Sequence, residues 1–225
     1  MFKVYRVPEG MEPIFVAGDP GEGVSFAAGV CISKKYKDVP LTYHARIESS
    51  AFGYELNKIG MFIKKKTGEY PLLAVERNIG AATIAKLIDL EYPYGKLYRQ
   101  KTFDRILKKE EDRIGWVTTS ANRRKMLDDL AFAIRRKELK IYDPDIVNEM
   151  LTFVIQERTG EPRPERNHYS DLIMALAIAN QIVGENIIPA KWAPSEKKEK
   201  ANFLPDKAEG FIVEKWQEKK DWRGS

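Results

Sequence analysis

Three carboxylates stand at the ends of apolar segments, where an unpaired charge is costly. Asp19 ends the apolar run 14–19, Glu76 ends the run 72–76, and Asp171 opens the Ala-rich run 171–179. Each acid taken alone is compatible with an ordinary strand end or helix cap. If all three converge in space, they can share one counter-charge, and carboxylate oxygens are ligands that Mg²⁺ and Mn²⁺ prefer. The pattern therefore predicts a divalent-metal site formed by Asp19, Glu76 and Asp171.

The order of apolar runs and turns in the first hundred residues predicts an α/β protein. Strand-like runs at 14–17, 24–33 and 41–48 are separated by turns, which indicates an antiparallel start with Asp19 on the first strand. A helix over 50–66, a strand over 72–76, a helix over 80–90 and a short strand over 96–99 follow. A helix between two strands indicates a parallel crossover. We therefore expect a mixed sheet, with its first three strands antiparallel and later strands parallel, flanked by helices.

The second half of the chain predicts mainly helices. Residues 102–118 are charged with interleaved apolar positions, which is typical of a hairpin or a flexible arm. Predicted elements then follow in this order: a helix to 137 with Ser120 as its N-cap, an edge strand over 139–142, a helix from Asp143-Pro144 to about 156, a polar loop over 159–167, and a last core helix over 169–183. We expect one domain over residues 1–189 and a loosely attached, Lys/Glu-rich tail over 190–225.

Positive charge is concentrated in the middle of the chain. Residues 96–140 hold fourteen Lys/Arg and seven Asp/Glu, a net +7, against +5 for the whole chain of 225 residues. This distribution favours a face that binds nucleic acid, although a pair of solvated helices would also account for it. The cations expected to contact a phosphate backbone are Lys108, Lys109, Arg113, Arg123, Arg124 and Lys125.

Several classes of site are excluded by composition. One cysteine, Cys31, and two histidines cannot build a zinc site of the Cys/His type. The glycine-rich segment 18–23 lacks the Lys-Ser/Thr pair of a phosphate-binding P-loop, so we expect no ATP site there. The N-terminus has no secretory pattern, and no apolar stretch has the length of a membrane span. A soluble intracellular protein is expected.

Accessory residues are predicted beside two of the acids. His168 precedes Asp171 by about one helical turn and could contact a water or a phosphate, or serve as a helix cap. Asn78 follows Glu76 by two residues and could orient a water or a phosphate, or cap the helix that starts near Gly80. Both alternatives stay open for each residue.

These segments together resemble the nuclease domain of the large terminase subunit of tailed bacteriophages, within the RNase H-like superfamily. The resemblance rests on Gly18-Asp19-Pro20-Gly21, on Glu76-Arg77-Asn78 with Gly80, and on His168-Tyr169-Ser170-Asp171-Leu172 with the Ala-rich run after it. It covers residues from about 14 to 182 and implies an RNase H-like mixed sheet. Many relatives carry a second acid beside the last aspartate, where this chain has Ser170, which makes Ser170 an accessory candidate.

The resemblance implies a metal-dependent endonuclease that cuts concatemeric viral double-stranded DNA during packaging. Asp19, Glu76 and Asp171 would bind two Mg²⁺ or Mn²⁺ ions for phosphodiester hydrolysis. No packaging ATPase motif occurs in the sequence. The chain is thus expected to be the nuclease part of a longer protein that includes an ATPase domain, binds the portal and the small terminase subunit, and acts in the host cytoplasm.

Two other functions stay open at this point. One is another RNase H-like nuclease, such as a junction resolvase or a nuclease of RNA/DNA hybrids. The other is a non-catalytic DNA-binding or portal-docking module, in which the three acids are structural. A metal site must stabilise the fold by mass action when the ion is added, whereas a docking module need not respond.

Overall fold

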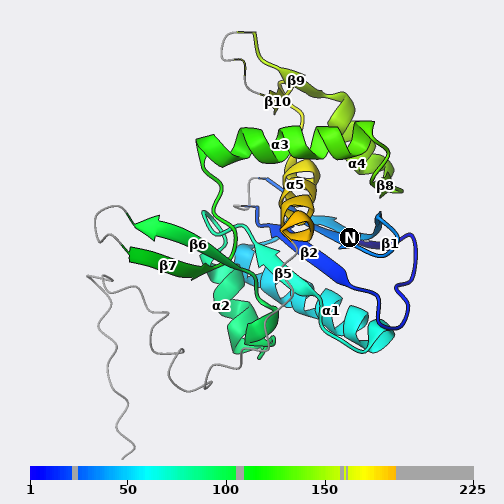
Figure 1. Cartoon of the computed structure of the whole chain (residues 1–225), viewed down its shortest axis with the longest axis vertical. Coiled ribbons are helices and arrows are strands. Elements are labelled where there is room, and N and C mark those ends of the chain that lie inside the picture. The colour runs from blue at the N-terminus through cyan, green and yellow to red at the C-terminus, as the bar shows by residue number, and fades with distance from the viewer. Residues whose placement is uncertain (22–24, 105–108, 158–159, 161, 186–225) are drawn as a thin grey trace, which may run out of the picture. The chain divides into compact units, whose positions relative to one another are not determined.

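The computed structural model describes residues 1–21, 25–104, 109–157, 160 and 162–185 (Figure 1). Its central sheet has six strands in the order β1-β4-β3-β2-β5, with β8 also paired to β4. The strands are β1 (Phe2–Val4), β2 (Ile14–Asp19), β3 (Ala27–Ser33), β4 (Asp38–Ala45), β5 (Leu72–Val75) and β8 (Lys140–Ile141). The predicted tail at 190–225 lies outside the described residues.

The sheet is mixed, which confirms the predicted fold class. Strands β2, β3 and β4 pair antiparallel in sequence, and β5 joins β2 in parallel. The N-terminal lead-in adds a strand that we did not predict, because β1 pairs antiparallel with β4 and the Phe2 ring packs edge-on against Phe62. The Asp19 strand is therefore the second along the chain and not the first.

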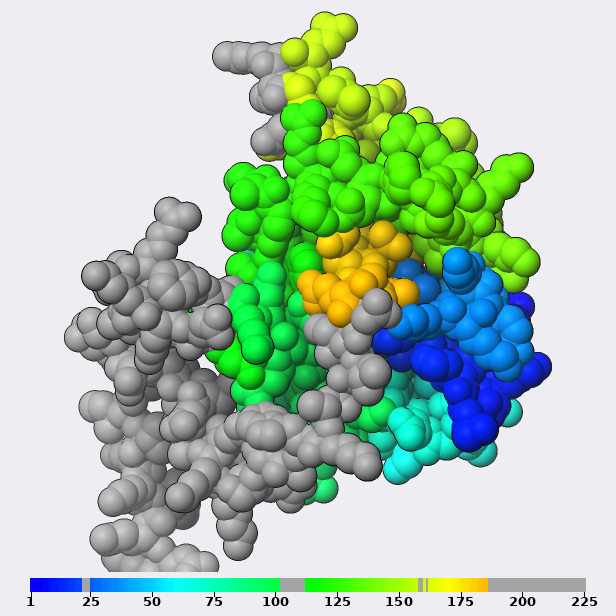
Figure 2. All heavy atoms as spheres, viewed as in Figure 1, coloured from blue at the N-terminus to red at the C-terminus, as the bar shows by residue number. Residues whose placement is uncertain are grey.

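Helices cover both faces of this sheet. On one face lie α1 (Ser49–Thr67) and α2 (Ala81–Asp89), which pack together, and on the other lie α5 (Asp171–Gly184) and α3 (Ser120–Arg135). Helix α5 contacts β2 and β3 directly, and α3 packs on α5. Figure 2 shows α5, in orange, between α3 and the first strands. The sheet and α3 thus enclose α5.

Helix α5 is apolar on every side, as expected for a helix that is surrounded by protein. Every residue from 172 to 179 is buried, and so is Ile182. Within the described part of the chain, no helix combines the length and apolarity needed to cross a bilayer. The burial of α5 fixes its N-terminus, where Asp171 is the first helical residue, close to the sheet.

Gly18 allows α1 to lie close to the end of β2. A Cβ atom at this position would stand 2.9 Å from Leu56 Cδ1 and 3.0 Å from Phe52 Cε1. Both side chains belong to α1 and are almost fully buried. A Cβ at the residue immediately before Asp19 would therefore force these side chains or their elements to shift, and glycine avoids this.

The charged segment after α2 forms a hairpin, one of the two structures that its pattern predicted. Strand β6 (Arg99–Asp104) pairs antiparallel with β7 (Lys109–Ile114). The short strand predicted over 96–99 is wrong in part, because a 3₁₀ turn, Tyr94–Lys96, precedes β6. At the base of the hairpin, the Trp116 amide donates to the Val75 carbonyl (2.8 Å). The hairpin therefore starts beside the end of β5.

Three predicted boundaries in the second half are wrong. The N-cap of α3 is Thr119 and not Ser120, because Thr119 and Asn122 each accept a hydrogen bond from the other's backbone amide. Helix α3 ends at Arg135. Helix α4 (Pro144–Leu151) ends five residues before position 156, since Phe153–Ile155 (β9) pairs with Pro162–Pro164 (β10), inside the segment predicted as loop.

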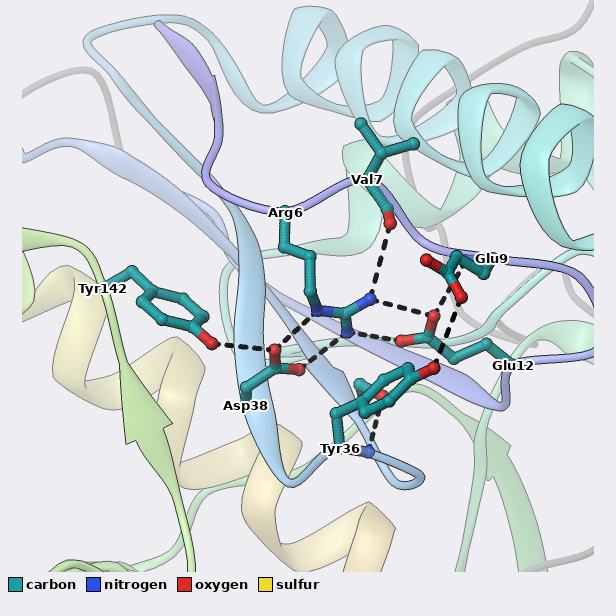
Figure 3. Close-up of polar contacts among 8 residues, drawn as sticks. Arg6, Val7, Glu9, Glu12, Tyr36, Asp38 and Tyr142 are labelled. Carbon is teal, nitrogen blue, oxygen red and sulfur yellow. Dashed lines mark hydrogen bonds and ion pairs between the residues drawn. The ribbon is translucent and has the colours of Figure 1, made fainter.

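A buried ion-pair network holds the N-terminal segment at the end of the sheet opposite to Asp19 (Figure 3). The Arg6 guanidinium donates to Asp38 (2.6 and 2.8 Å) and to Glu12 (2.5 and 3.0 Å). Both carboxylates are buried, and Glu12 also accepts the Glu9 amide (2.8 Å). Bidentate geometry on two sides makes this a strong contact between the segment before β2 and the start of β4.

Candidate active site

Strands β2 and β5 place Asp19 and Glu76 side by side. Gly18 pairs with Val75 in the parallel register, and the Glu76 amide donates to the Gly18 carbonyl (2.8 Å). Alternate residues of each strand face α5, as Ala17 and Ala74 do in the core cluster that contains this helix. Asp19 follows Ala17 by two residues, and Glu76 follows Ala74 by two residues. Both carboxylates therefore project from the carboxyl ends of their strands toward α5.

The two carboxylates form a buried pair. Asp19 and Glu76 each have 9% of their surface exposed. Burial raises the pKa of Asp19 well above its usual value, and the negative charge of Glu76 raises this pKa further. The pair therefore carries less negative charge than two free carboxylates would.

Asp171 approaches the same place from the start of α5. Burial raises the pKa of Asp171, and the nearby backbone amides of Phe26 and of Asp171 itself oppose this rise. Phe26 precedes β3, where Ala28 pairs with Asp19. The Asp171 charge accordingly raises the pKa of Asp19. Its Oδ2 atom is buried and has no hydrogen-bond partner among the described residues, an arrangement that costs free energy unless a cation or donor binds there.

A fourth acid, Glu149 of α4, lies next to these three and was missed in the sequence. Its carboxylate accepts the amides of Leu172 (3.4 Å) and Ile173 (3.0 Å), in the first turn of α5. Burial raises its pKa to about 7, these amides lower it, and the charge of Asp171 raises it. Ser170, the N-cap of α5, makes no side-chain capping bond. Glu149 thus takes the place of a local cap and anchors the helix that carries Asp171.

The donor chemistry of this cluster suits a hard divalent cation. Asp19 and Glu76 offer carboxylate oxygens, and the Oδ2 atom of Asp171 offers a further ligand. Among the residues described, however, no three acidic, histidine or cysteine side chains stand ready to hold one ion together. Because burial and neighbouring charges raise the pKa of Asp19, binding of a cation would favour its deprotonated form and would strengthen as pH rises.

Comparison with known proteins finds the same fold in viral terminase nuclease domains. No protein-family model matches the sequence, and no curated protein gives a significant match. Solved structures do match. They include the large terminase nuclease of thermophilic phage G20c with bound magnesium (TM-score 0.60, 11% identity, 80% of this chain and 86% of that one) and that of Thermus phage P74-26 (0.53, 14%, 79% and 81%). The human cytomegalovirus terminase nuclease domain also matches (0.54, 11%, 76% and 82%). This chain has the large terminase nuclease fold.

Within the terminase nuclease fold, the predicted accessory residues occupy different positions. His168 is exposed, and with Tyr169 and Glu149 it lines a surface hollow of about 450 Å³ beside the start of α5. The capping role considered for Asn78 is wrong, because its amide donates to the Thr118 carbonyl (2.7 Å) and Gly80 is the N-cap of α2. Ser170 lies directly before Asp171, with its carbonyl bonded to the Met174 amide.

The predicted DNA-binding cations are distributed over the hairpin and α3. Lys108 lies outside the described residues. Lys109 and Arg113 belong to β7, and Arg113 is exposed.

The three cations of α3 have local partners. Lys125 contacts Asp129 (2.6 Å), and Arg124 lies 3.9 Å from Asp128. Arg123 donates to the Pro162 carbonyl (2.9 Å), which joins α3 to β10. Because the two ion pairs are exposed, a phosphate could replace either acid at little cost.

Proposed function

We propose that this chain is a metal-dependent endonuclease that cleaves double-stranded viral DNA concatemers during genome packaging. The observation that carries the proposal is the pairing of Asp19 with Glu76 at the ends of two parallel strands, with the charge of Asp171 reaching Asp19. The terminase nuclease fold supports the same conclusion, and one neighbour with this fold is a nuclease with bound magnesium.

In this proposal Asp19, Glu76 and Asp171 hold two Mg²⁺ or Mn²⁺ ions. When bound, the ions would supply positive charge to the phosphoryl oxygens and make a water a better nucleophile. The protein's own contribution would be to hold the three carboxylates at one end of the sheet, where the raised pKa of Asp19 lets it exchange a proton for a cation. Glu149 holds the first turn of α5, and with it Asp171, in position.

The proposed reaction hydrolyses a phosphodiester and leaves 5′-phosphate and 3′-hydroxyl ends. Cations of the hairpin and of α3, including Arg113 and Arg124, would hold the backbone with little sequence selectivity, so binding should weaken steeply with salt. In a longer protein the chain would work beside an ATPase domain, the portal and the small terminase subunit, in the cytoplasm of the host.

The direct test is cleavage of supercoiled plasmid in Mn²⁺, in Mg²⁺ or in chelator, read on a gel. We expect nicked and linear products only with metal, and a loss of about a thousandfold or more in Asp19→Asn. Glu12→Gln is the matched control, since it also removes a buried carboxylate, at the opposite end of β2. Cleavage by Asp19→Asn in Mn²⁺ at the wild-type rate would refute the assignment. A parallel set of linear duplex, four-way junction and RNA/DNA hybrid identifies the preferred substrate.

A further inference from the structure

An aromatic and cationic surface cluster lies directly beside the candidate active site. We call Phe26, Arg46 and Tyr169 the Arg46 platform. The Arg46 guanidinium lies 4.7 Å above the Phe26 ring and donates to the Tyr169 hydroxyl (2.8 Å). The Phe26 ring in turn packs edge-on against Tyr169, with centroids 5.0 Å apart, and lies tilted against His44, with centroids 4.4 Å apart. These contacts hold an exposed cation in one place.

Two members of the platform lie close along the chain to the acids of the candidate site. Phe26 directly precedes β3, where Ala28 pairs with Asp19, and its ring supports Arg46. Tyr169 stands two residues before Asp171, at the entry to α5. Arg46 is therefore held by residues that lead into the elements beside Asp19 and Asp171.

Most of the hydrogen-bonding capacity of Arg46 is unused within the described part of the chain. The guanidinium has five N–H donors, and the bond to the Tyr169 hydroxyl uses one of them. Its other contacts in that part are the faces of Phe26 and Tyr169, and it forms no ion pair there. Arginine can stack on a ring and still donate two parallel bonds to an anion. Little side-chain entropy is lost when an anion binds to a guanidinium that is already held.

We propose that Arg46 binds a backbone phosphate of the DNA strand adjacent to the phosphate that is cut. This inference rests on the proposed nuclease function and names a contact that orients its substrate. The surface hollow beside Tyr169 is lined by Asp145 and Glu149 as well as by His44 and His168, and its two acids disfavour a phosphate. The phosphate is therefore received on the Arg46 side, and the strand passes over the platform toward Asp171.

The test measures duplex binding in the Asp19→Asn background by fluorescence anisotropy, across a series of salt concentrations. Adding Arg46→Ala should weaken binding about tenfold at low salt. It should also reduce the slope of log affinity against log salt by about 1, as expected for one lost phosphate contact. Arg46→Lys should keep the slope and lose part of the affinity, because it retains the charge without the planar fork.

Lys58→Ala is the control for net charge. Lys58 is also an exposed cation over a ring, 4.6 Å from Tyr54, but it lies on α1, across the sheet from α5. We expect an unchanged slope for this variant. Equal slopes for Arg46→Ala and Lys58→Ala would overturn the Arg46 contact and leave the nuclease proposal standing if the wild type cuts plasmid. If the protein neither binds nor cuts duplex DNA, both proposals fail.

Discussion

Asp19 and Glu76 lie side by side, one residue beyond the register pair Gly18–Val75 of the parallel strands β2 and β5. This relationship makes one end of the sheet chemically different from the other. At the opposite end, buried acids are neutralised by Arg6, whereas here burial and like charges raise the pKa of Asp19. Buried acids that lack a basic partner are a common feature of functional sites.

The raised pKa of Glu149 predicts how the stability of the fold changes with pH. Burial raises its pKa from an ordinary 4.5 to about 7, so between these values the folded protein holds a proton that the unfolded chain releases. Its contribution to stability is therefore full below pH 4.5 and falls as pH rises through 7. Relative to the wild type, Glu149→Gln should gain about 1–3 kcal/mol in unfolding free energy from pH 5 to pH 8. Urea titrations in chelator at several pH values measure this difference.

Glu12→Gln is the control for that experiment, because the opposite sign is expected. Burial works to raise the pKa of Glu12, but bonds from Arg6 and the Glu9 amide lower it overall. The wild-type carboxylate then adds stability above its unfolded pKa and loses it as pH falls. The free energy of unfolding of Glu12→Gln, relative to that of the wild type, should therefore fall as pH rises. Parallel pH profiles for the two variants would contradict the environments described for both acids.

Removal of the Arg6 side chain should destabilise the fold without affecting catalysis. Arg6→Ala leaves the buried carboxylates of Asp38 and Glu12 unpaired, and breaking such a network costs about 3–5 kcal/mol. Cleavage per folded molecule should stay at the wild-type level, since the network and Asp19 lie at opposite ends of β2. Chemical denaturation and plasmid nicking measured on one preparation test the separation. A loss of less than about 1 kcal/mol would show that the network contributes little.

Gly18→Ala should lower stability and activity together. The added Cβ would meet Leu56 Cδ1 at 2.9 Å, so either α1 or the end of β2 must shift. Overpacking of this kind costs about 1–3 kcal/mol, and the shift would move Asp19. Gly184→Ala, where nothing lies within 4 Å of the new Cβ, is the control. Full activity and stability of Gly18→Ala would argue against tight packing at this position.

The strand ends that carry Asp19 and Glu76 were predictable because local apolar runs and turns define them. The buried helix with Asp171 at its start was equally visible as an uninterrupted apolar segment. The end of α4 was not, because residues 153–155 leave the helix to pair with 162–164, and this contact is tertiary. The N-cap of α3 was predictable, since Asn122 stands three residues after Thr119 in a capping-box position.

Glu149 could not be identified from local sequence, because the amides that it binds lie 23 and 24 residues further along the chain. One signal was present: Glu149 shares the buried face of α4 with Ile146, three residues before it. An acid on an apolar stripe indicates a buried partner but does not say which one. Arg46 gave no such signal, since its neighbours Phe26 and Tyr169 come from opposite ends of the domain.

Calorimetric titration of the protein with Mn²⁺ at pH 8 tests the central claim most directly. The wild type should bind Mn²⁺, with release of protons, and Asp19→Asn, Glu76→Gln and Asp171→Asn should each lose most of that binding while Glu12→Gln retains it. Wild-type Mn²⁺ affinity in all three variants would contradict a shared metal site at Asp19, Glu76 and Asp171.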